Sequence, residues 1–233
     1  MGKYTTIFWD LDRTIWDFNK NSHETLKELF EVHQLEARGI KSFEKFYRRY
    51  LKVNNYLWYL YNHNKINKVD LRSVRFRDTL KAFDIEDEEL ALTLSDEYIT
   101  QCPKKGVLVD GALEIIQGCQ TKGYKQVILT NGFEETQKVK MKHADLNQYF
   151  DMMISSELVD CQKPYAPIFD YALEHMNVKA EEVVMIGDSW ESDIVGAKNM
   201  DIDQIYYNPG KENMSFEPTH NIQHLSALKE ILL

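Results

Sequence analysis

The sequence predicts an α/β protein: a doubly wound parallel sheet with helices on both faces and an α-helical unit inserted after the first strand. Two observations predict it. From about residue 106 onward, short apolar runs alternate with segments of helical periodicity, which is typical of parallel strands connected by helices. One more apolar run, Tyr4 to Trp9, is separated from these by residues 15–100, whose apolar spacing is helical. We therefore expect a core of residues 1–15 and 101–233 and a helical domain of residues 16–100.

The helical domain follows from side-chain spacing. Asn21, with Glu24 three residues later, resembles a capped helix start. Apolar stripes at helical spacing follow and should pack as a small bundle. The stripes comprise Leu26, Leu29 and Phe30; Phe43, Phe46, Tyr47, Tyr50, Leu51, Leu57, Trp58 and Tyr61; and Leu90, Leu94 and Tyr98. We expect Arg72, Arg75 and Arg77 to form a solvated helix face.

In the second half of the chain we expect strands and helices in alternation. Helices are expected at Ala112 to Lys122, where Gly123 ends the helix, and at Glu134 to His143. Because both faces of such a sheet are covered, its strands read as continuous apolar runs. They are expected at Gln126 to Thr130, Asp151 to Ser155, Val183 to Ile186 and Gln204 to Tyr207.

Composition and charge limit the classes of function. The chain has 233 residues, 43% of them hydrophobic, and no uninterrupted apolar stretch long enough to span a membrane. A formal net charge of −9 argues against broad binding of nucleic acid polymers. The three cysteines form no CxxC pair, so neither a disulfide framework nor a structural zinc site is indicated. We expect a cytoplasmic monomer or dimer with no membrane partner.

Polar residues follow each of the central predicted strands. They are Asp10 and Asp12 after the first strand, Thr130, Asn131 and Gly132 after the next, Lys163 in the loop after the third, and Asp188 and Asp193 after the fourth. Ligands of open parallel sheets bind beyond the carboxyl ends of the strands, so these groups should gather at one edge. Carboxylates suit a hard cation such as Mg²⁺, while an ammonium, a hydroxyl and N–H groups suit phosphate oxygens. The set therefore predicts a site for a phosphate with magnesium.

Each motif alone also has an ordinary structural explanation. Two aspartates after a strand can form a turn or cap a helix, and Asn-Gly is frequent in turns. Lys163 before a proline could be an exposed loop residue, and Asp193 a first-turn residue at the positive end of a helix. Ser189 is expected to be structural. Their order along one chain is what favours chemistry.

The ordered set DLDRT, TNG, KP and GDSWESD, within residues 10–193, resembles the four motifs of the haloacid dehalogenase superfamily. The resemblance implies a Rossmann-like core and a magnesium-dependent phosphatase. The helical insertion resembles the small cap domain that some members carry directly after the first motif. The expected substrate is a small phosphorylated metabolite, hydrolysed at a phosphate monoester bond.

The resemblance also implies roles for the carboxylates. Asp10 would be the nucleophile that forms an aspartyl-phosphate, and Asp12 the general acid and then the base. Magnesium would be held by Asp10, Asp188 and the backbone carbonyl of Asp12. Asp193 would act on the metal through water or by orienting Lys163.

The phosphoryl group would be held by Thr130 and Lys163, with Asn131 and Gly132 as further donors. Within the superfamily, the motifs and the aromatic-rich helical domain resemble bacterial 5′-nucleotidases that act on pyrimidine mononucleotides. Rings that the core of this domain cannot accommodate could stack on a base. The candidate rings are Tyr47, Tyr50, Tyr56, Trp58, Tyr59 and Tyr61.

Alternatives on the same fold remain open. Sugar-phosphate phosphatases and phosphomutases share all four motifs, and product analysis separates the phosphomutases. Haloacid dehalogenases need no magnesium and lack the second aspartate, so Asp12 and Asp188 count against that activity. A catalytically silent binding protein is disfavoured because every charged group of the motifs is present. Arg13 and Gln162 stand where relatives often have small residues, which could alter access or leaving-group preference.

Overall fold

The structure, a computed structural model, describes residues 3–233, which divide into two compact units. The core unit comprises the residues up to Phe18 together with Gly106–Leu233, and the helical unit comprises Asn19–Lys105. From the sequence we expected the helical unit to follow residue 15 and the core to resume at residue 101, a few residues before the boundaries in the structure in each case. Among the described residues, no helix combines the length and the apolar character that a membrane span requires.

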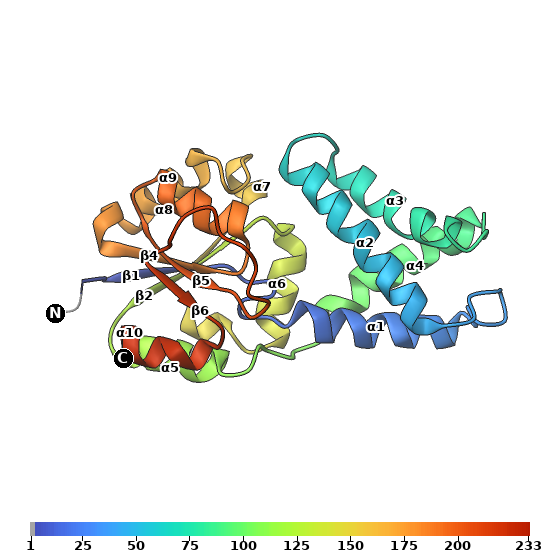
Figure 1. The fold of residues 1–233 in the computed structure, drawn as a ribbon, viewed down its shortest axis with the longest axis horizontal. Helices are drawn as coiled ribbons and strands as arrows, with labels where there is room; N and C mark the ends of the chain where they lie inside the picture. The colour runs from blue at the N-terminus through green and yellow to red at the C-terminus, as the bar shows by residue number, and fades with distance from the viewer. Residues whose placement is uncertain (1–2) are drawn as a thin grey trace. The chain divides into compact units, whose positions relative to one another are not determined.

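The core unit is built on a parallel six-stranded sheet, which confirms the predicted fold class (Figure 1). Its strands are β1 (Thr6–Trp9), β2 (Lys125–Thr130), β3 (Met152–Ser155), β4 (Val183–Gly187), β5 (Asp203–Tyr207) and β6 (His220–Ile222). Their order across the sheet is β3-β2-β1-β4-β5-β6, so β1 lies between β2 and β4. The first five strands lie where the sequence predicted them. The sixth was missed because three residues, one of them the exposed Asn221, carry no apolar run.

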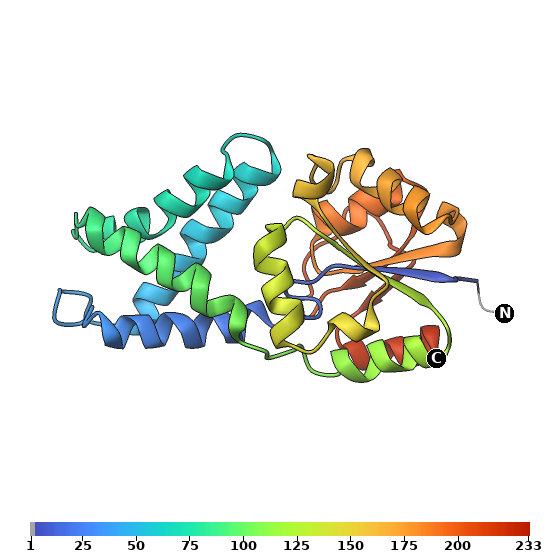
Figure 2. The ribbon, with the colours of Figure 1, turned by 180° about the vertical axis from the view of Figure 1, so that it is seen from behind.

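Helices cover both faces of this sheet. They are α5 (Ala112–Thr121), α6 (Glu134–His143), α7 (Ser156–Val159), α8 (Ala166–Met176), α9 (Gly196–Asn199) and α10 (Leu228–Leu232). Figures 1 and 2 show α8 and α9 on one face and α5 and α10 on the other. On the first face Phe8, Leu129 and Met185 pack with Phe169 of α8 in one apolar cluster. All four residues of β1 are buried, as expected for a central strand with both faces covered.

A short backbone pairing joins the two segments of the core unit that flank the helical unit. The N–H of Asp17 donates to the carbonyl of Val107 at 3.0 Å, and the N–H of Val109 donates to the carbonyl of Ile15 at 2.9 Å. Trp16 and Leu108 form an antiparallel bridge between these two bonds. We call this pairing of residues 15–17 with 107–109 the clamp. The clamp holds side by side the two chain segments between which the helical unit is inserted.

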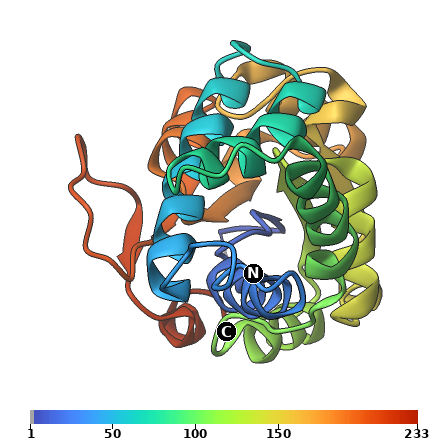
Figure 3. The same ribbon diagram turned by 90° about the vertical axis from the view of Figure 1, so that its right-hand side faces the viewer.

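The helical unit consists of four helices. They are α1 (Phe18–Val32), α2 (Phe43–Asn62), α3 (Lys68–Lys81) and α4 (Glu88–Gln101). Ser42 caps α2, and Asn67 with Asp70 forms a reciprocal capping box on α3. α2 packs along α3, and α3 along α4 (Figure 3). Their shared interior is rich in rings, with those of Tyr50 and Phe76 centred 5.2 Å apart.

Two predictions for this unit were wrong. α1 begins at Phe18, directly after the clamp, so Asn21 lies inside the helix and is fully buried rather than capping it. Arg75 is also buried, not solvated, because it lies one helical turn from Leu71 on the inward face of α3. Of the rings proposed for base stacking, Tyr50 and Tyr61 belong to the core. Tyr56 and Tyr59 are 61% and 47% exposed.

Candidate functional site

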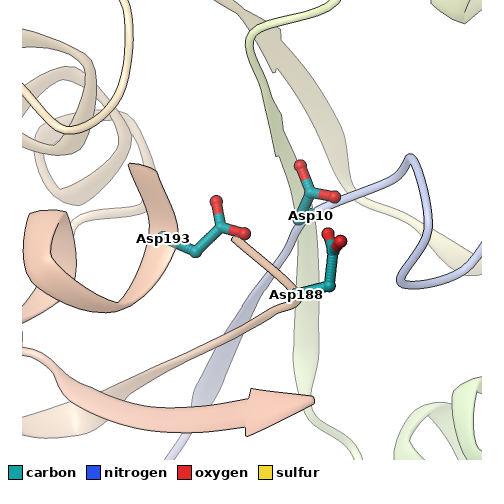
Figure 4. Close-up of side chains that lie close together, drawn as sticks. All are labelled: Asp10, Asp188 and Asp193. Carbon is teal, nitrogen blue, oxygen red and sulfur yellow. The ribbon is translucent and has the colours of Figure 1, made fainter. Parts of the chain in front are cut away.

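Three aspartates converge at the carboxyl edge of the sheet. Asp10 directly follows β1, Asp188 directly follows β4, and Asp193 lies in a π-helical turn, Trp190–Val195, after β4. One carboxylate oxygen from each lies within 4.8 Å of the others. Figure 4 shows the three side chains directed toward a common point. The proximity of Asp10 and Asp188 follows from the pairing of β1 with β4, which sets Trp9 opposite Ile186.

The approach of Asp193 depends on local backbone structure. The hydroxyl of Ser189 accepts from the N–H of Ser192 at 3.3 Å and so caps the π-helical turn. The N–H of Ser189 donates to Asp193 Oδ2 at 3.0 Å. Gly187 gives the carboxylate room, since a Cβ there would lie 2.1 Å from Asp193 Oδ2. Ser189 is therefore structural in its contacts, and a glycine is required at position 187.

Lys163 is the cation of this cluster and is 1% exposed. Its Nζ donates to Asp10 Oδ1 at 2.9 Å and to the carbonyl of Leu129 at 2.5 Å, and lies 2.7 Å from Asp193 Oδ1. Asn131 fixes its backbone, because the side-chain amide donates to the Lys163 carbonyl at 2.9 Å and accepts from the Lys163 N–H at 2.8 Å. The amide of Asn131 is thus engaged in holding Lys163.

The cluster holds more negative charge than Lys163 neutralises. Burial raises the pKa of Asp10 to about 7, with the charge of Asp193 acting in the same direction and Lys163 opposing it. Burial, followed by the charges of Asp10 and Asp193, raises the pKa of Asp188 well above its usual value. For Lys163, burial disfavours the ammonium, but the two carboxylates outweigh it and raise the pKa. Three carboxylates around one ammonium are a donor set suited to a hard divalent cation.

Thr130 ends β2 with a hydroxyl that already accepts two hydrogen bonds. The N–H of Gly132 donates to Thr130 Oγ1 at 3.0 Å, and Gln137 Nε2 donates to the same oxygen at 2.7 Å. A hydroxyl has two lone pairs and one hydrogen, so Thr130 retains its O–H for a further acceptor. Gly132 again leaves necessary room, because a Cβ there would lie 2.1 Å from Gln137 Nε2.

Asp12 lies outside the triad of carboxylates. Its side chain turns toward α6 and pairs with Lys140, whose Nζ lies 2.6 and 2.8 Å from the two carboxylate oxygens. Neither Lys140 nor Gln137 was predicted from the sequence, because both are polar residues on a helix and neither lies at the end of a strand. The available signal was that both lie on the same side of the expected helix as Met141.

Arg13 adopts an unusual backbone conformation in the turn after β1. Its φ of 67° is in the left-handed region, which non-glycine residues seldom occupy. Its guanidinium lies 4.5 Å from the ring centre of Phe18. Its charge also opposes the rise in the pKa of Asp188. The N–H of Arg13 donates to the carbonyl of Trp16 at 2.8 Å, which closes the turn.

Known proteins resemble this chain over nearly its whole length. A family model described as haloacid dehalogenase-like hydrolase matches residues 4–201. Pyrimidine 5′-nucleotidase YjjG of Escherichia coli is 30% identical over 233 residues, 99% of this chain and 98% of its own. Pyrimidine 5′-nucleotidase PynA of Streptococcus pneumoniae is 27% identical, covering 98% and 95%. A magnesium-bound crystal structure of the HAD-hydrolase YfnB from Bacillus subtilis has a TM-score of 0.89 at 28% identity, covering 99% of both chains.

Proposed function

This chain belongs to the haloacid dehalogenase-like hydrolases, and from that premise we propose that it is a magnesium-dependent phosphatase with Asp10 as nucleophile. The observation that carries the proposal is the convergence of Asp10, Asp188 and Asp193 around Lys163 at the carboxyl edge of the sheet. Such an excess of carboxylate suits a cation with a bound phosphate and has no evident use in packing.

In the proposed reaction, the Asp10 carboxylate attacks phosphorus and a new O–P bond forms as the bond to the ester oxygen breaks. The electron pair of the broken bond goes to that oxygen, which takes a proton from Asp12. Water then attacks the aspartyl-phosphate, and Asp12 takes the proton that the water loses. Inorganic phosphate and the free Asp10 carboxylate result, so the cycle balances without any redox partner.

The remaining residues position charge. Thr130 would donate its retained O–H to a phosphate oxygen. Lys163, whose ammonium contacts Asp10 and Asp193, would fix the orientation of the Asp10 carboxylate and offset the charge of the phosphoryl group that it helps to hold. Asn131 serves this arrangement by holding the backbone of Lys163. Gly132 serves it by leaving room for the side chain of Gln137.

Magnesium would be held by Asp10, Asp188 and the backbone carbonyl of Asp12, where it would offset the charges of the phosphate and of the carboxylates. The carboxylate cluster and the magnesium in the crystal structure of YfnB support this assignment. The ion pair of 2.7 Å between Lys163 and Asp193 supports an orienting part for Asp193, one of the two roles considered from the sequence.

We infer further that the substrates are pyrimidine nucleoside monophosphates. Two relatives that match nearly the whole chain are pyrimidine 5′-nucleotidases. Exposed rings such as Tyr56 and Tyr59 are surfaces on which a base can stack, at about 1–3 kcal/mol per base. A small sugar phosphate would gain less from such rings.

Release of phosphate from para-nitrophenyl phosphate tests the chemistry. We expect turnover with magnesium, none in excess chelator, and recovery when magnesium is added back. Calcium should restore activity poorly, because its looser coordination misplaces the nucleophile and phosphorus. Full activity in excess chelator would reject the metal-dependent mechanism.

A panel of phosphate esters tests the substrate class separately. We expect kcat/KM for uridine, deoxyuridine or thymidine monophosphate to exceed that for hexose and glycolate phosphates. If a sugar phosphate exceeds every nucleotide tested, the nucleotidase assignment fails while the phosphatase chemistry stands. Release of phosphate, rather than of an isomeric phosphate ester, excludes a phosphomutase.

A further inference from the structure

A buried cation on α6 contacts Asp12, and neither the motifs nor the proposed reaction has used it. The side chain of Lys140 is 8% exposed, and its Nζ lies 2.6 Å from Oδ1 and 2.8 Å from Oδ2 of Asp12. Both carboxylate oxygens are thus engaged by one ammonium. A lysine this buried is unfavourable unless it is paired, so the contact fixes both side chains.

Gln137, one helical turn before Lys140, contacts the same carboxylate. Its Nε2 donates to Asp12 Oδ2 at 2.9 Å and to Thr130 Oγ1 at 2.7 Å, which uses both hydrogens of the amide. The side chain of Gln137 is fully buried. The amide therefore ties the carboxylate of Asp12 to the hydroxyl proposed to hold the phosphoryl group.

Trp16 limits where the ammonium of Lys140 can go. The Nζ lies 4.5 Å from the ring centre of Trp16, a distance typical of a cation–π contact, and Trp16 is fully buried. Trp16 also closes the turn that carries Asp12, through a backbone bridge between the two residues. Trp16 thus contacts the ammonium with its ring and fixes the turn of Asp12 with its backbone.

We propose that Lys140 and Gln137 are positioning residues that hold the carboxyl group of Asp12 beside Thr130 for its two proton transfers. The assignment rests on the proposed function, in which Asp12 gives a proton to the ester oxygen and later takes one from water. The ion pair with Lys140 fixes the direction in which that carboxyl group points. Gln137 keeps the same group in register with the phosphoryl site in both halves of the cycle.

Two aryl esters of different leaving group test this assignment. Phenyl phosphate must expel a basic oxygen and needs the proton of Asp12, whereas para-nitrophenyl phosphate expels a stable anion and needs it less. For Lys140→Met we expect kcat/KM to fall about tenfold to a hundredfold with phenyl phosphate, and less than about threefold with para-nitrophenyl phosphate. kcat should fall for both esters, because water attack needs Asp12 whichever group has left. KM for para-nitrophenyl phosphate should therefore fall together with kcat, which general structural damage would not produce.

Companion variants separate positioning from other roles. Lys142 is an exposed lysine on the same helix, and Lys142→Met should leave kcat/KM for both esters unchanged. Lys140→Arg retains the cation and should recover part of the loss. Gln137→Met should lower kcat/KM more for phenyl phosphate than for para-nitrophenyl phosphate, as Lys140→Met does. It tests the assignment independently if Lys140→Met does not fold. In an Asp12→Asn background, Lys140→Met should change the rate of para-nitrophenol release by less than about twofold, because its partner is already absent.

Some outcomes would overturn the assignment. Equal losses of kcat/KM for both esters, or a full additional loss in the Asp12→Asn background, would mean that Lys140 acts on the phosphate itself. No loss with either ester would mean that the ion pair has no part in turnover. Inactivity of the unmodified chain toward both esters, with magnesium present, would instead overturn the proposed function and this assignment with it.

Discussion

The core unit and the helical unit bury charge in opposite ways. In the core unit each buried cation has carboxylate partners: Lys163 lies against Asp10 and Asp193, and Lys140 against Asp12. In the helical unit, Arg75 is 5% exposed and has no carboxylate within ion-pair distance anywhere in residues 3–233.

Rings and an amide take the place of a counter-ion around Arg75. Its guanidinium carbon lies 4.8 Å from the ring centre of Tyr98, and its Nη1 donates to Asn54 Oδ1 at 3.3 Å. Such contacts satisfy a cation locally, although Nε has no hydrogen-bond partner among the described residues. Burial of charge alone therefore does not indicate chemistry. What distinguishes the core unit is the accumulation of like charges around too few opposite ones.

The strongest way to break this comparison is to neutralise one carboxylate of the cluster. Asp10→Asn should abolish turnover while the protein stays folded, because an amide cannot form the phosphoryl intermediate. Phosphate release and circular dichroism should be measured on the same sample. Residual activity above about one part in a hundred would reject Asp10 as the nucleophile, since losing a nucleophile normally costs far more.

A second variant removes the cation of the cluster. Lys163→Met leaves Asp10 and Asp193 buried without their partner, so we expect the free energy of unfolding to fall by about 3–5 kcal/mol. Urea denaturation without added metal measures it, with Lys142→Met as the control for loss of an exposed lysine. A loss below about 1 kcal/mol would mean that Lys163 does not offset the charges of the two buried carboxylates.

The matching change in the helical unit should cost less. Arg75→Met leaves no carboxylate without a partner and keeps a long apolar side chain among the rings, so we expect a loss below about 2 kcal/mol. kcat/KM for para-nitrophenyl phosphate should be unchanged. The contrast between the units fails if Arg75→Met destabilises the protein as much as Lys163→Met does.

The smallest effect is expected at a paired charge of the core unit that belongs to none of the four motifs. Asp203, at the start of β5, accepts hydrogen bonds from Lys3 and Tyr4. Partial burial would raise the pKa of Asp203, but these two partners outweigh it and lower the pKa. Its contribution to stability is therefore present above the unfolded pKa of about 3.9 and is lost as the pH falls through the lower folded value.

Asp203→Asn tests that contribution. The variant should be less stable than the unmodified chain at pH 7, and the difference should shrink below about pH 4. Urea midpoints at several pH values measure it. A difference that grows as the pH falls would show that the sign is wrong.

The polar residues that follow the central strands could be predicted because the strands themselves could be predicted. β1 and β4 are buried on both faces and read as apolar runs, and neighbouring parallel strands deliver Asp10 and Asp188 to the same edge. The contacts of Lys163 were not predictable in the same way. They depend on two hydrogen bonds to Asn131 and on a π-helical turn at Asp193. Neither feature can be predicted from the spacing of residues in the sequence.

Helices misled the sequence reasoning wherever a polar side chain faces inward. Asn21, Arg75 and Lys140 all lie on buried faces, but from the spacing of apolar residues Asn21 was predicted to cap a helix, Arg75 was predicted to be solvated, and Lys140 received no prediction. At Asn21 the cause is the clamp, which ends at Asp17 and lets the helix begin at once. At Lys140 and Arg75 the cause is tertiary: a carboxylate in one case and rings in the other make burial tolerable.

The clamp has a consequence for protein engineering. Because residues 15–17 and 107–109 are hydrogen-bonded to each other, the splice points on either side of the helical unit are near neighbours, whatever lies between them. A foreign insert whose own ends lie equally close could be grafted there without displacing β1 or Asp10. The clamp thus provides a fixed attachment point for an inserted domain. Recombining inserted domains from different proteins at this position should yield hybrids whose substrate preference changes while the sheet does not.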